Sequence, residues 1–237
     1  MVSRPASKPD LTFASDHSLL VVFGDEISPE IHLEVLRLTS LLLQESGRDI
    51  LNVHPGYSSV LITFNLSITS PPDIERKVRH LLTSMDSIEV PRRREVEIPV
   101  CYQGEFAPDL EHVARHNNLT GAEVIRLHSS AAYVVYFLGF TPGFPYLGGM
   151  PKEIATPRHP TPRRSVEAGS VGIAGQQTGL YPVTSPGGWQ IIGRTPITLF
   201  DSRVRPPTFL QMGDHVRFAS VSRADYDNLT IHRAGTG

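Results

Sequence analysis

The densest run of glycine and proline in the chain lies between Tyr133 and Arg194. It opens with the hydrophobic segment Tyr133–Leu138 and continues through GFTPGFPYLGG, GSVGIAGQQTG and SPGGWQIIGR. Glycine adopts backbone angles closed to other residues, whereas proline fixes φ and removes a hydrogen-bond donor. Because aromatic and β-branched residues are interleaved with them, the run predicts rigid, shaped loops between short strands rather than disorder. Loops of this kind on a β scaffold are a common place for binding and catalysis.

Length and composition limit the class of protein. At 237 residues the chain has room for one large domain or two small ones. A net charge of −2 gives no reason to expect nucleic acid or an anionic membrane as a partner. The single cysteine, Cys101, excludes an internal disulfide. The N-terminus lacks the apolar core of a signal peptide and no stretch approaches the ~20 apolar residues of a membrane span, so we predict a cytoplasmic protein.

Residues 10–90 predict a small α+β domain. Hydrophobic runs at 18–23, 50–53 and 58–64 predict strands, and Ser28-Pro29-Glu30 and Pro71-Pro72-Asp73 are typical helix starts. The resulting order of strand, helix, strand, strand, helix favours a ferredoxin-like fold. No chemical signature occurs in this part, which we interpret as scaffold or interface.

Residues 95–222 predict a second domain, after a polar linker that ends near Arg94. A half-buried strand is expected first, at 95–101. Two helices follow, at 108–115 and from Thr120, where Thr-Gly-Ala-Glu is a capping box. After them only short strands separated by turn residues are expected, which favours a closed or nearly closed barrel. The predicted strands are 133–138, 170–174, 189–192, 197–200 and 215–218. Residues 223–237 are polar and are expected to be a frayed tail.

Several long motifs resemble one known family. The segments GFTPGFPYLGGMP, ATPR, TPRRSVEAGSVGIAGQQTGLYPVTSPGGWQIIGRTP and LFD are similar to the family of the 5-oxoprolinase B subunit. That family is also called allophanate hydrolase subunit 1, includes a bacterial inhibitor of a sporulation histidine kinase, and is related to the carboxyltransferase region of urea carboxylase. The resemblance extends over nearly the whole chain, through IPVCY, PDLEHVARHNNLTGAEVIRLHS and GDHVRF. It implies a ferredoxin-like N-terminal domain and a cyclophilin-like β-barrel C-terminal domain.

Two positions depart from the pattern of that family. Glu167 stands where proline is usual, and Gln103 stands where glycine is usual. Glu167 adds a charge beside the Gly-rich loop.

The resemblance implies a function in a complex. It implies ATP-dependent opening of 5-oxoproline to L-glutamate, with ATP and Mg bound by an assembled heteromer rather than by this chain alone. The implied partners are the 5-oxoprolinase C subunit, which is a related carboxyltransferase-like protein, and the A subunit, and the chain is expected to be inactive alone. One alternative is a regulatory protein that binds and inhibits a sensor histidine kinase. A second alternative is urea or allophanate metabolism, which loses ground because the chain carries no biotin-carrier or amidase signature.

The chemistry implied by the resemblance calls for cationic side chains and a general base. Arg158, Arg163 and Arg194 each stand beside a proline or glycine, and the planar fork of arginine suits a carboxylate. Pairing with structural carboxylates or loop carbonyls is the competing interpretation for each of them. His128 is the best general base by residue type, although capping of a helix end is the favoured interpretation. These four are the catalytic candidates.

The remaining candidates come from the glycine-rich and aromatic loops. The Gly172–Gly179 segment is able to present amides to an anion, but it is not a phosphate loop because no GxxxxGK[ST] occurs. Neither a zinc pattern nor a GxSxG nucleophile elbow is present, so no metal site is predicted. The candidate substrate-binding residues are Gln176, Gln177, Tyr181, Gly187 and Gly188. The candidate interface residues are Phe140, Pro142, Gly143, Phe144, Pro145, Tyr146 and Trp189.

Overall fold

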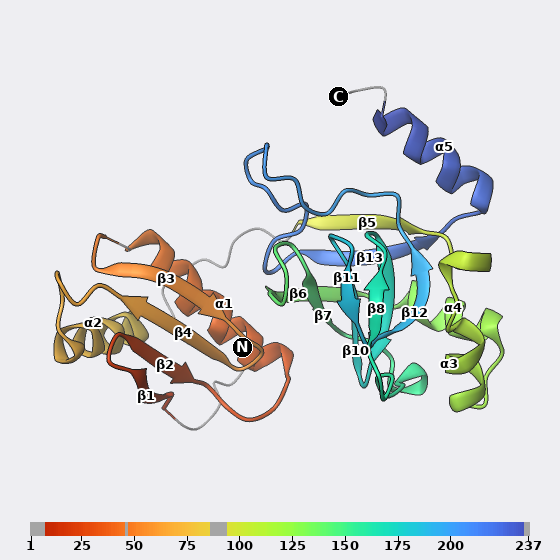
Figure 1. Cartoon of the computed structure of the whole chain (residues 1–237). Helices are drawn as coiled ribbons and strands as arrows, with labels where there is room; N and C mark the ends of the chain where they lie inside the picture. Colours follow the sequence, from red (N-terminus) through yellow and green to blue (C-terminus); the bar gives the residue numbers. More distant parts are fainter. Residues whose placement is uncertain (1–7, 46, 86–93, 235–237) are drawn as a thin grey trace. The chain divides into compact units, whose positions relative to one another are not determined.

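The chain forms two separate β-sheet cores, one from residues that precede position 86 and one from residues that follow position 93 (Figure 1). The structure is a computed structural model that describes residues 8–45, 47–85 and 94–234. The domain boundary predicted between residues 90 and 95 falls largely on residues outside these ranges. None of the helices in the described ranges combines the length and hydropathy that a bilayer crossing requires.

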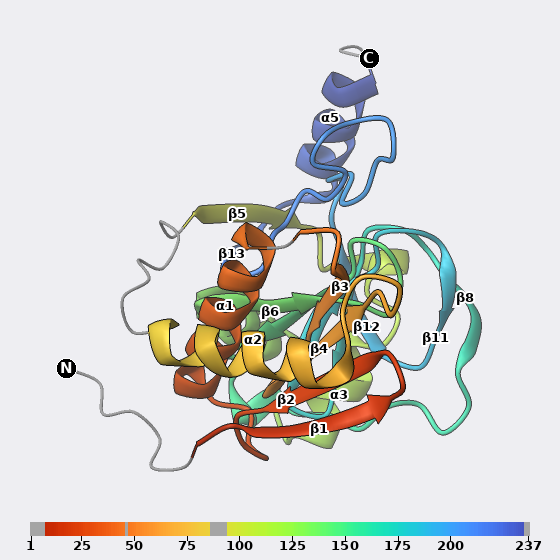
Figure 2. The ribbon, with the colours of Figure 1, turned by 90° about the vertical axis from the view of Figure 1, so that its left-hand side faces the viewer.

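The first unit is a four-stranded antiparallel sheet with the strand order β1-β2-β4-β3. Helices α1 and α2 lie on the same side of this sheet and contact each other (Figure 2). The alternating residues of β2 and β4, including Leu19, Val21, Val60 and Ile62, are fully buried beneath them. The elements are β1 Asp10–Ser15, β2 Ser18–Val22, α1 Pro29–Gln44, β3 Ile50–Pro55, β4 Ser59–Phe64 and α2 Pro71–Ser84.

The predicted strand-helix-strand-strand-helix order is present as β2-α1-β3-β4-α2, but sequence analysis missed β1. That strand pairs along one edge of the sheet and most of its residues are exposed, so its hydrophobic signal is weak. Ser28 starts α1 as expected, since its Oγ accepts from the Ile31 amide at 3.2 Å. The ferredoxin-like class stays a prediction, because the observed unit has an additional strand, β1, before the first strand of the predicted order.

The second unit is built on a seven-stranded sheet with the order β12-β9-β10-β7-β6-β13-β5. Its two edges meet where Cys101, next to β5, forms an antiparallel bridge with Arg194 at the end of β12, with N–O distances of 2.9 and 3.0 Å. This bridge nearly closes the sheet into a barrel, whose interior holds Tyr133, Val135, Leu147, Ile173 and Leu180. The strands are β5 Glu95–Val100, β6 Tyr133–Leu138, β7 Pro145–Gly148, β9 Ser170–Ala174, β10 Gln177–Leu180, β12 Gln190–Arg194 and β13 His215–Ser220. A mixed α and β fold with a nearly closed barrel is therefore confirmed, and the cyclophilin-like class stays a prediction.

Two helices and a separate two-stranded sheet complete the barrel unit. Helix α3 (Leu110–His116) packs against α4 (Gly121–Ser130) and β12. The predicted capping box of α4 is confirmed: the Thr120 side chain accepts from the Glu123 amide at 3.2 Å, and Glu123 Oε2 accepts from the Thr120 amide at 2.7 Å. Strands β8 (Arg163–Val166) and β11 (Ser185–Gly187) pair with each other outside the main sheet.

Two predictions for the C-terminal part are wrong. Residues 197–200 form no strand, because Thr195 Oγ1 accepts a hydrogen bond from the Ile197 amide at 3.2 Å in a turn. Within 197–200, only Phe200 forms a β-bridge. The expected frayed tail instead begins with helix α5 (Arg223–Ala234). Ser222 caps this helix by accepting from the Asp225 amide at 3.1 Å, so the Ser-x-x-Asp signal of a helix start was present and was missed.

Candidate functional site

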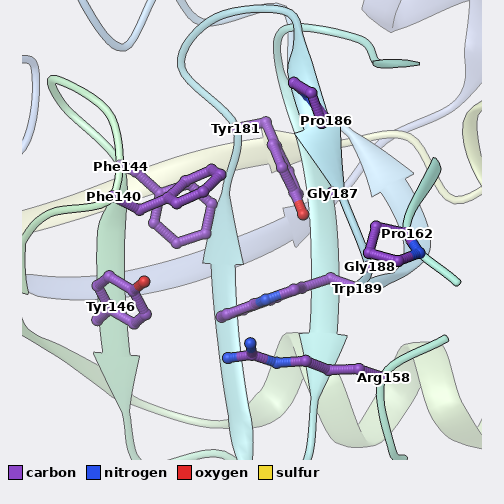
Figure 3. A pocket seen from close by; sticks show the side chains of 10 residues that line it. All are labelled: Phe140, Phe144, Tyr146, Arg158, Pro162, Tyr181, Pro186, Gly187, Gly188 and Trp189. Atoms are coloured by element: carbon purple, nitrogen blue, oxygen red, sulfur yellow. The ribbon is translucent and has the colours of Figure 1, made fainter. Parts of the chain in front are cut away.

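A cavity of about 380 Å³ lies in the barrel unit, and ten residues line it (Figure 3). They come from four places: the loop before β7 and β7 itself, the segment before β8, the residue that follows β10, and β11 with its connection to β12. The glycine- and proline-rich run that dominates the sequence thus forms the whole cavity. The lining residues are Phe140, Phe144, Tyr146, Arg158, Pro162, Tyr181, Pro186, Gly187, Gly188 and Trp189.

Aromatic rings packed edge to face form one wall. The buried Phe144 ring lies 5.2 Å from Tyr181, 5.3 Å from Trp189 and 5.6 Å from Phe140, with interplanar angles of 88°, 83° and 78°. Edge-to-face contacts are a preferred arrangement of aromatic pairs and hold the rings in fixed orientations. Phe140 differs from the others because its side chain is 63% exposed and its φ is +67°, so an aromatic residue stands in solvent at the cavity with a rare backbone conformation.

A glycine fixes the position of the Tyr181 hydroxyl. A Cβ atom on Gly187 would meet Tyr181 Oη at 2.3 Å, so only the absence of a side chain there lets the phenol reach its place. Burial raises the pKa of Tyr181 above its usual value of 10.0, against the opposite effects of the Trp189 amide and Arg158. Burial likewise raises the pKa of Tyr146. Tyr181 therefore keeps its proton at neutral pH and is able to donate a hydrogen bond.

Arg158 supplies the positive charge of the cavity. Its guanidinium carbon lies 5.8 Å from the centre of the Trp189 ring, a cation–π arrangement. Within the described part of the chain, no carboxylate or carbonyl oxygen pairs with this guanidinium. The donors of Arg158 consequently remain available to an anionic group.

Two hydrogen bonds anchor the short segment that carries Arg158. The Gln190 Nε2 atom donates to the Pro157 carbonyl at 2.8 Å, and the His159 amide donates to the Gly188 carbonyl at 2.7 Å. These contacts come from residues on both sides of Trp189. The cation and the aromatic wall are therefore tied to each other through the backbone.

The structure gathers many of the predicted site residues at this cavity. Arg158, the candidate substrate contacts Tyr181, Gly187 and Gly188, and the candidate interface residues Phe140, Phe144, Tyr146 and Trp189 all line it. Pro142, Gly143 and Pro145 belong to the same loop but are not part of the lining. Gln176 and Gln177 lie at the β9–β10 hairpin and are not in the lining either.

The other two arginines have different surroundings. Arg163 Nη2 donates to Asp109 at 2.6 Å and Arg163 Nη1 donates to the Trp189 carbonyl at 3.3 Å, which is the structural pairing named as its competing interpretation. Arg194 lies over the Phe106 ring at 4.9 Å and is not in the cavity lining. Arg163 is therefore paired, whereas the buried Nε of Arg194 has no hydrogen-bond partner in the described part of the chain, so Arg194 differs from Arg158 in its position outside the cavity lining.

His128 lies inside the barrel and is fully buried. Its Nδ1 is 2.8 Å from Tyr102 Oη and its Nε2 is 3.0 Å from Thr178 Oγ1, while the ring stacks on Phe218 at 4.5 Å. Burial lowers its pKa from 6.5 to about 3. Because Thr178 Oγ1 already donates to the Gly172 carbonyl, it accepts from Nε2, which leaves Nδ1 to accept from Tyr102. This neutral, satisfied imidazole belongs to the core in the structure, and the proposed role as general base gains no support from its position.

Sequence reasoning missed Asp109 and Gln190, whose side chains hold the cavity from behind. Both are almost fully buried. No local signal identifies them, because their partners lie 33 to 82 positions away in the chain. The unusual residues Glu167 and Gln103 are exposed and neither lines the cavity.

Comparison with known proteins gives a consistent result over most of the chain. The sequence profile of the family described as "Carboxyltransferase domain, subdomain C and D" matches residues 9–210. A Bacillus subtilis protein named as the B subunit of 5-oxoprolinase is 43% identical over 221 residues, which covers 89% of this chain and 92% of that protein. The Escherichia coli O157:H7 protein of the same name is 44% identical over 197 residues and covers 81% and 89%. A urea amidolyase of Saccharomyces cerevisiae is 28% identical, and the match spans 13% of its length.

Among solved structures, the crystal structure of TTHA0988 is 35% identical with a TM-score of 0.77. The match covers 86% of this chain and 40% of that chain. The chain therefore spans about two fifths of the length of that protein.

Proposed function

Because the chain belongs to the family of carboxyltransferase subdomains C and D, we propose that it is the B subunit of an ATP-dependent 5-oxoprolinase, which opens 5-oxoproline to L-glutamate. The identity of 43% over 92% of the Bacillus subtilis protein of that name supports this function. The structural observation that supports this function is the aromatic cavity with an unpaired arginine, since flat aromatic walls and a cation suit a flat substrate that carries a carboxylate.

The substrate is a flat five-membered lactam that carries one carboxylate. We propose that Phe144 and Trp189 enclose the ring, because aromatic walls bury flat apolar surface and exclude water. Arg158 then binds the carboxylate, since a guanidinium is able to donate two parallel hydrogen bonds to it. The Tyr181 hydroxyl donates to the lactam carbonyl from a position that Gly187 makes possible.

Opening the ring requires activation of a resonance-stabilised amide. ATP would supply it by transfer of its γ-phosphoryl group to the carbonyl oxygen with departure of ADP. Water would then add to the ring carbon, and cleavage of the ring C–N bond with release of phosphate would give glutamate. The negative charge of a transferring phosphoryl group needs several cationic or amide donors. Arg158 is the one charged residue in the cavity lining of the described chain, so we assign ATP and Mg to the assembled complex rather than to this cavity alone.

Two features of the chain support the presence of a partner polypeptide. The match to TTHA0988 covers only 40% of that chain, which is consistent with a second polypeptide that completes the arrangement here. Phe140, exposed at the cavity, is a suitable contact for such a partner because large aromatic residues are enriched at interfaces. The proposed partners are the C subunit and the A subunit of 5-oxoprolinase, and the proposed consequence is that this chain has no 5-oxoprolinase activity alone.

Reconstitution tests the function. We expect the three co-expressed subunits to hydrolyse ATP and form glutamate when 5-oxoproline is added, and omission of this chain to abolish both reactions. ATP-coupled glutamate formation by this chain alone would refute its dependence on partners. A complex with full activity in its absence would refute the function itself.

The same experiment addresses the two alternatives. Inhibition of a histidine kinase and a role in urea or allophanate metabolism stay predictions. Autophosphorylation of a co-expressed kinase that falls when this chain is added, without any 5-oxoproline-dependent ATP hydrolysis, would favour the regulatory role. ATP hydrolysis that responds to urea or allophanate instead of 5-oxoproline would favour the metabolic alternative.

A further inference from the structure

We infer that Asp109 is a positioning residue that holds Arg158 and Trp189 in place for the ligand of the cavity. The inference rests on the proposed function for the identity of that ligand. Asp109 directly precedes α3 and is only 5% exposed. It is not among the residues that line the cavity, so its buried carboxylate lies behind the cavity wall.

Both carboxylate oxygens of Asp109 accept from the segments that make this wall. Oδ2 accepts from the Ile191 amide at 2.6 Å, and Oδ1 accepts from Arg163 Nη2 at 2.6 Å. The Asp109 amide also donates to the Ile191 carbonyl at 2.9 Å. The carboxylate thus fastens the strand that follows Trp189 to the strand that follows the Arg158 segment.

The connection from Asp109 to Arg158 runs through two neighbours in the chain. His159, next to Arg158, places its Nε2 atom 3.4 Å from Asp109 Oδ1. Arg163 donates from its second terminal nitrogen to the Trp189 carbonyl at 3.3 Å. One buried carboxylate therefore contacts a residue adjacent to the cation, and through Arg163 it is also linked to the backbone of the aromatic wall.

The substitution Asp109→Asn separates this role from bulk and shape. Asparagine has the same size, but one of its two terminal atoms is an NH₂ donor. Both carboxylate oxygens of Asp109 face hydrogen-bond donors. Whichever way the asparagine side chain turns, its NH₂ group therefore replaces the acceptor of either the Ile191 backbone amide or the Arg163 guanidinium. We expect the β8 side and the β12 side of the wall to loosen relative to each other.

Trp189 reports on the wall directly, because it is the single tryptophan of the chain. In D109N we expect red-shifted emission and stronger quenching by acrylamide in the absence of any ligand. We also expect 5-oxoproline to bind about tenfold more weakly in a fluorescence titration, a loss of the order expected from one hydrogen bond.

A second buried aspartate of the same unit provides the matched control. Asp214 is 4% exposed, accepts from Arg94 Nε at 2.9 Å and from the Gln211 amide at 2.7 Å, and within the described ranges its side chain has no hydrogen bond to a cavity residue. D214N is expected to lower the melting temperature while the Trp189 emission, its quenching and the affinity for 5-oxoproline stay as in the wild type.

The outcomes separate this inference from the proposed function. If wild-type protein fails to bind 5-oxoproline, the proposed ligand is wrong, and the ligand-free Trp189 signals of D109N and D214N still test the positioning role. Identical Trp189 emission and quenching in D109N and wild type, both folded by circular dichroism, would overturn the inference.

Discussion

We propose that ligand binding in the cavity depends most on Arg158. Its guanidinium lies over Trp189 without an oxygen partner in the described chain, whereas Arg163 is committed to Asp109. Residue type and neighbouring prolines made the two equal candidates in the sequence. Only the three-dimensional position of Asp109, 54 residues before Arg163, distinguishes them.

Arg158→Ala should weaken binding of 5-oxoproline by about tenfold to a hundredfold, because a hydrogen bond to a charged group contributes about 1.5–3 kcal/mol. Fluorescence titration of Trp189 measures the affinity. The matched ligand is 2-pyrrolidinone, which has the same lactam ring without the carboxylate, and its affinity should be unchanged by the substitution. Equal affinity of wild type and variant for 5-oxoproline would show that the carboxylate is bound elsewhere.

Gly187→Ala should displace the Tyr181 ring, because the new methyl group would lie 2.3 Å from Tyr181 Oη. We expect a loss of about 1–3 kcal/mol in the free energy of unfolding, the usual cost of overpacking, together with weaker lactam binding. Gly188→Ala is the control, since its methyl group would meet nothing closer than 3.7 Å. Thermal melts that show equal effects of the two substitutions would contradict this explanation of Gly187.

At the scale of elements, the predictions succeeded where the signal is local. The capping box at Thr120 and Glu123 lies within four residues and was identified correctly. The glycine- and proline-rich loops were correctly chosen as the place of the cavity because their composition alone requires shaped loops. Edge strand β1 and the outlying strand β8 were missed, since a strand with little buried surface leaves little hydrophobic alternation to detect. The mostly buried strands β7 and β10 were missed as well, because glycine and proline within them weaken the strand signal.

His128 illustrates what local signals cannot reveal. A histidine near a helix end is a plausible proton carrier by type, but its function depends on the strands that surround it. Tyr102 and Thr178 lie 26 and 50 positions away in the chain and complete its hydrogen bonds. Burial by these tertiary neighbours, rather than any property of α4, makes it a neutral core residue.

The barrel should lose stability in mild acid through His128. Its pKa in the folded state is about 3 and its unperturbed value is 6.5, so between these values the unfolded chain binds a proton that the folded chain does not. Stability therefore falls as the pH is lowered through this window, by about 1.4 kcal/mol per pH unit at most. Urea unfolding followed by Trp189 fluorescence should show that His128→Gln loses about 2 kcal/mol less than wild type between pH 7 and pH 5. Parallel losses in the two proteins would assign the acid sensitivity of the barrel to groups other than His128.

At the scale of the whole molecule, the proposed ligand cavity has a lining in which Arg158 is the one charged residue among the described residues. Aromatic rings, one arginine and one tyrosine hydroxyl suit recognition of a small cyclic carboxylate. Phosphoryl transfer requires more charge than this lining contains. We therefore propose a division of labour, in which this chain holds the lactam and its partners supply the activating nucleotide.

The most direct test of this account is the 5-oxoproline-dependent ATP hydrolysis of the reconstituted complex that contains the Arg158→Ala chain. The account predicts that the variant assembles with its partners but that 5-oxoproline, at the concentration that half-saturates wild type, stimulates ATP hydrolysis about fivefold to fiftyfold less, as expected from tenfold to hundredfold weaker binding. A complex with Arg194→Ala, whose arginine lies outside the cavity lining, should retain stimulation. Normal stimulation with Arg158→Ala, in a complex of verified composition, would contradict the claim that this cavity binds the substrate.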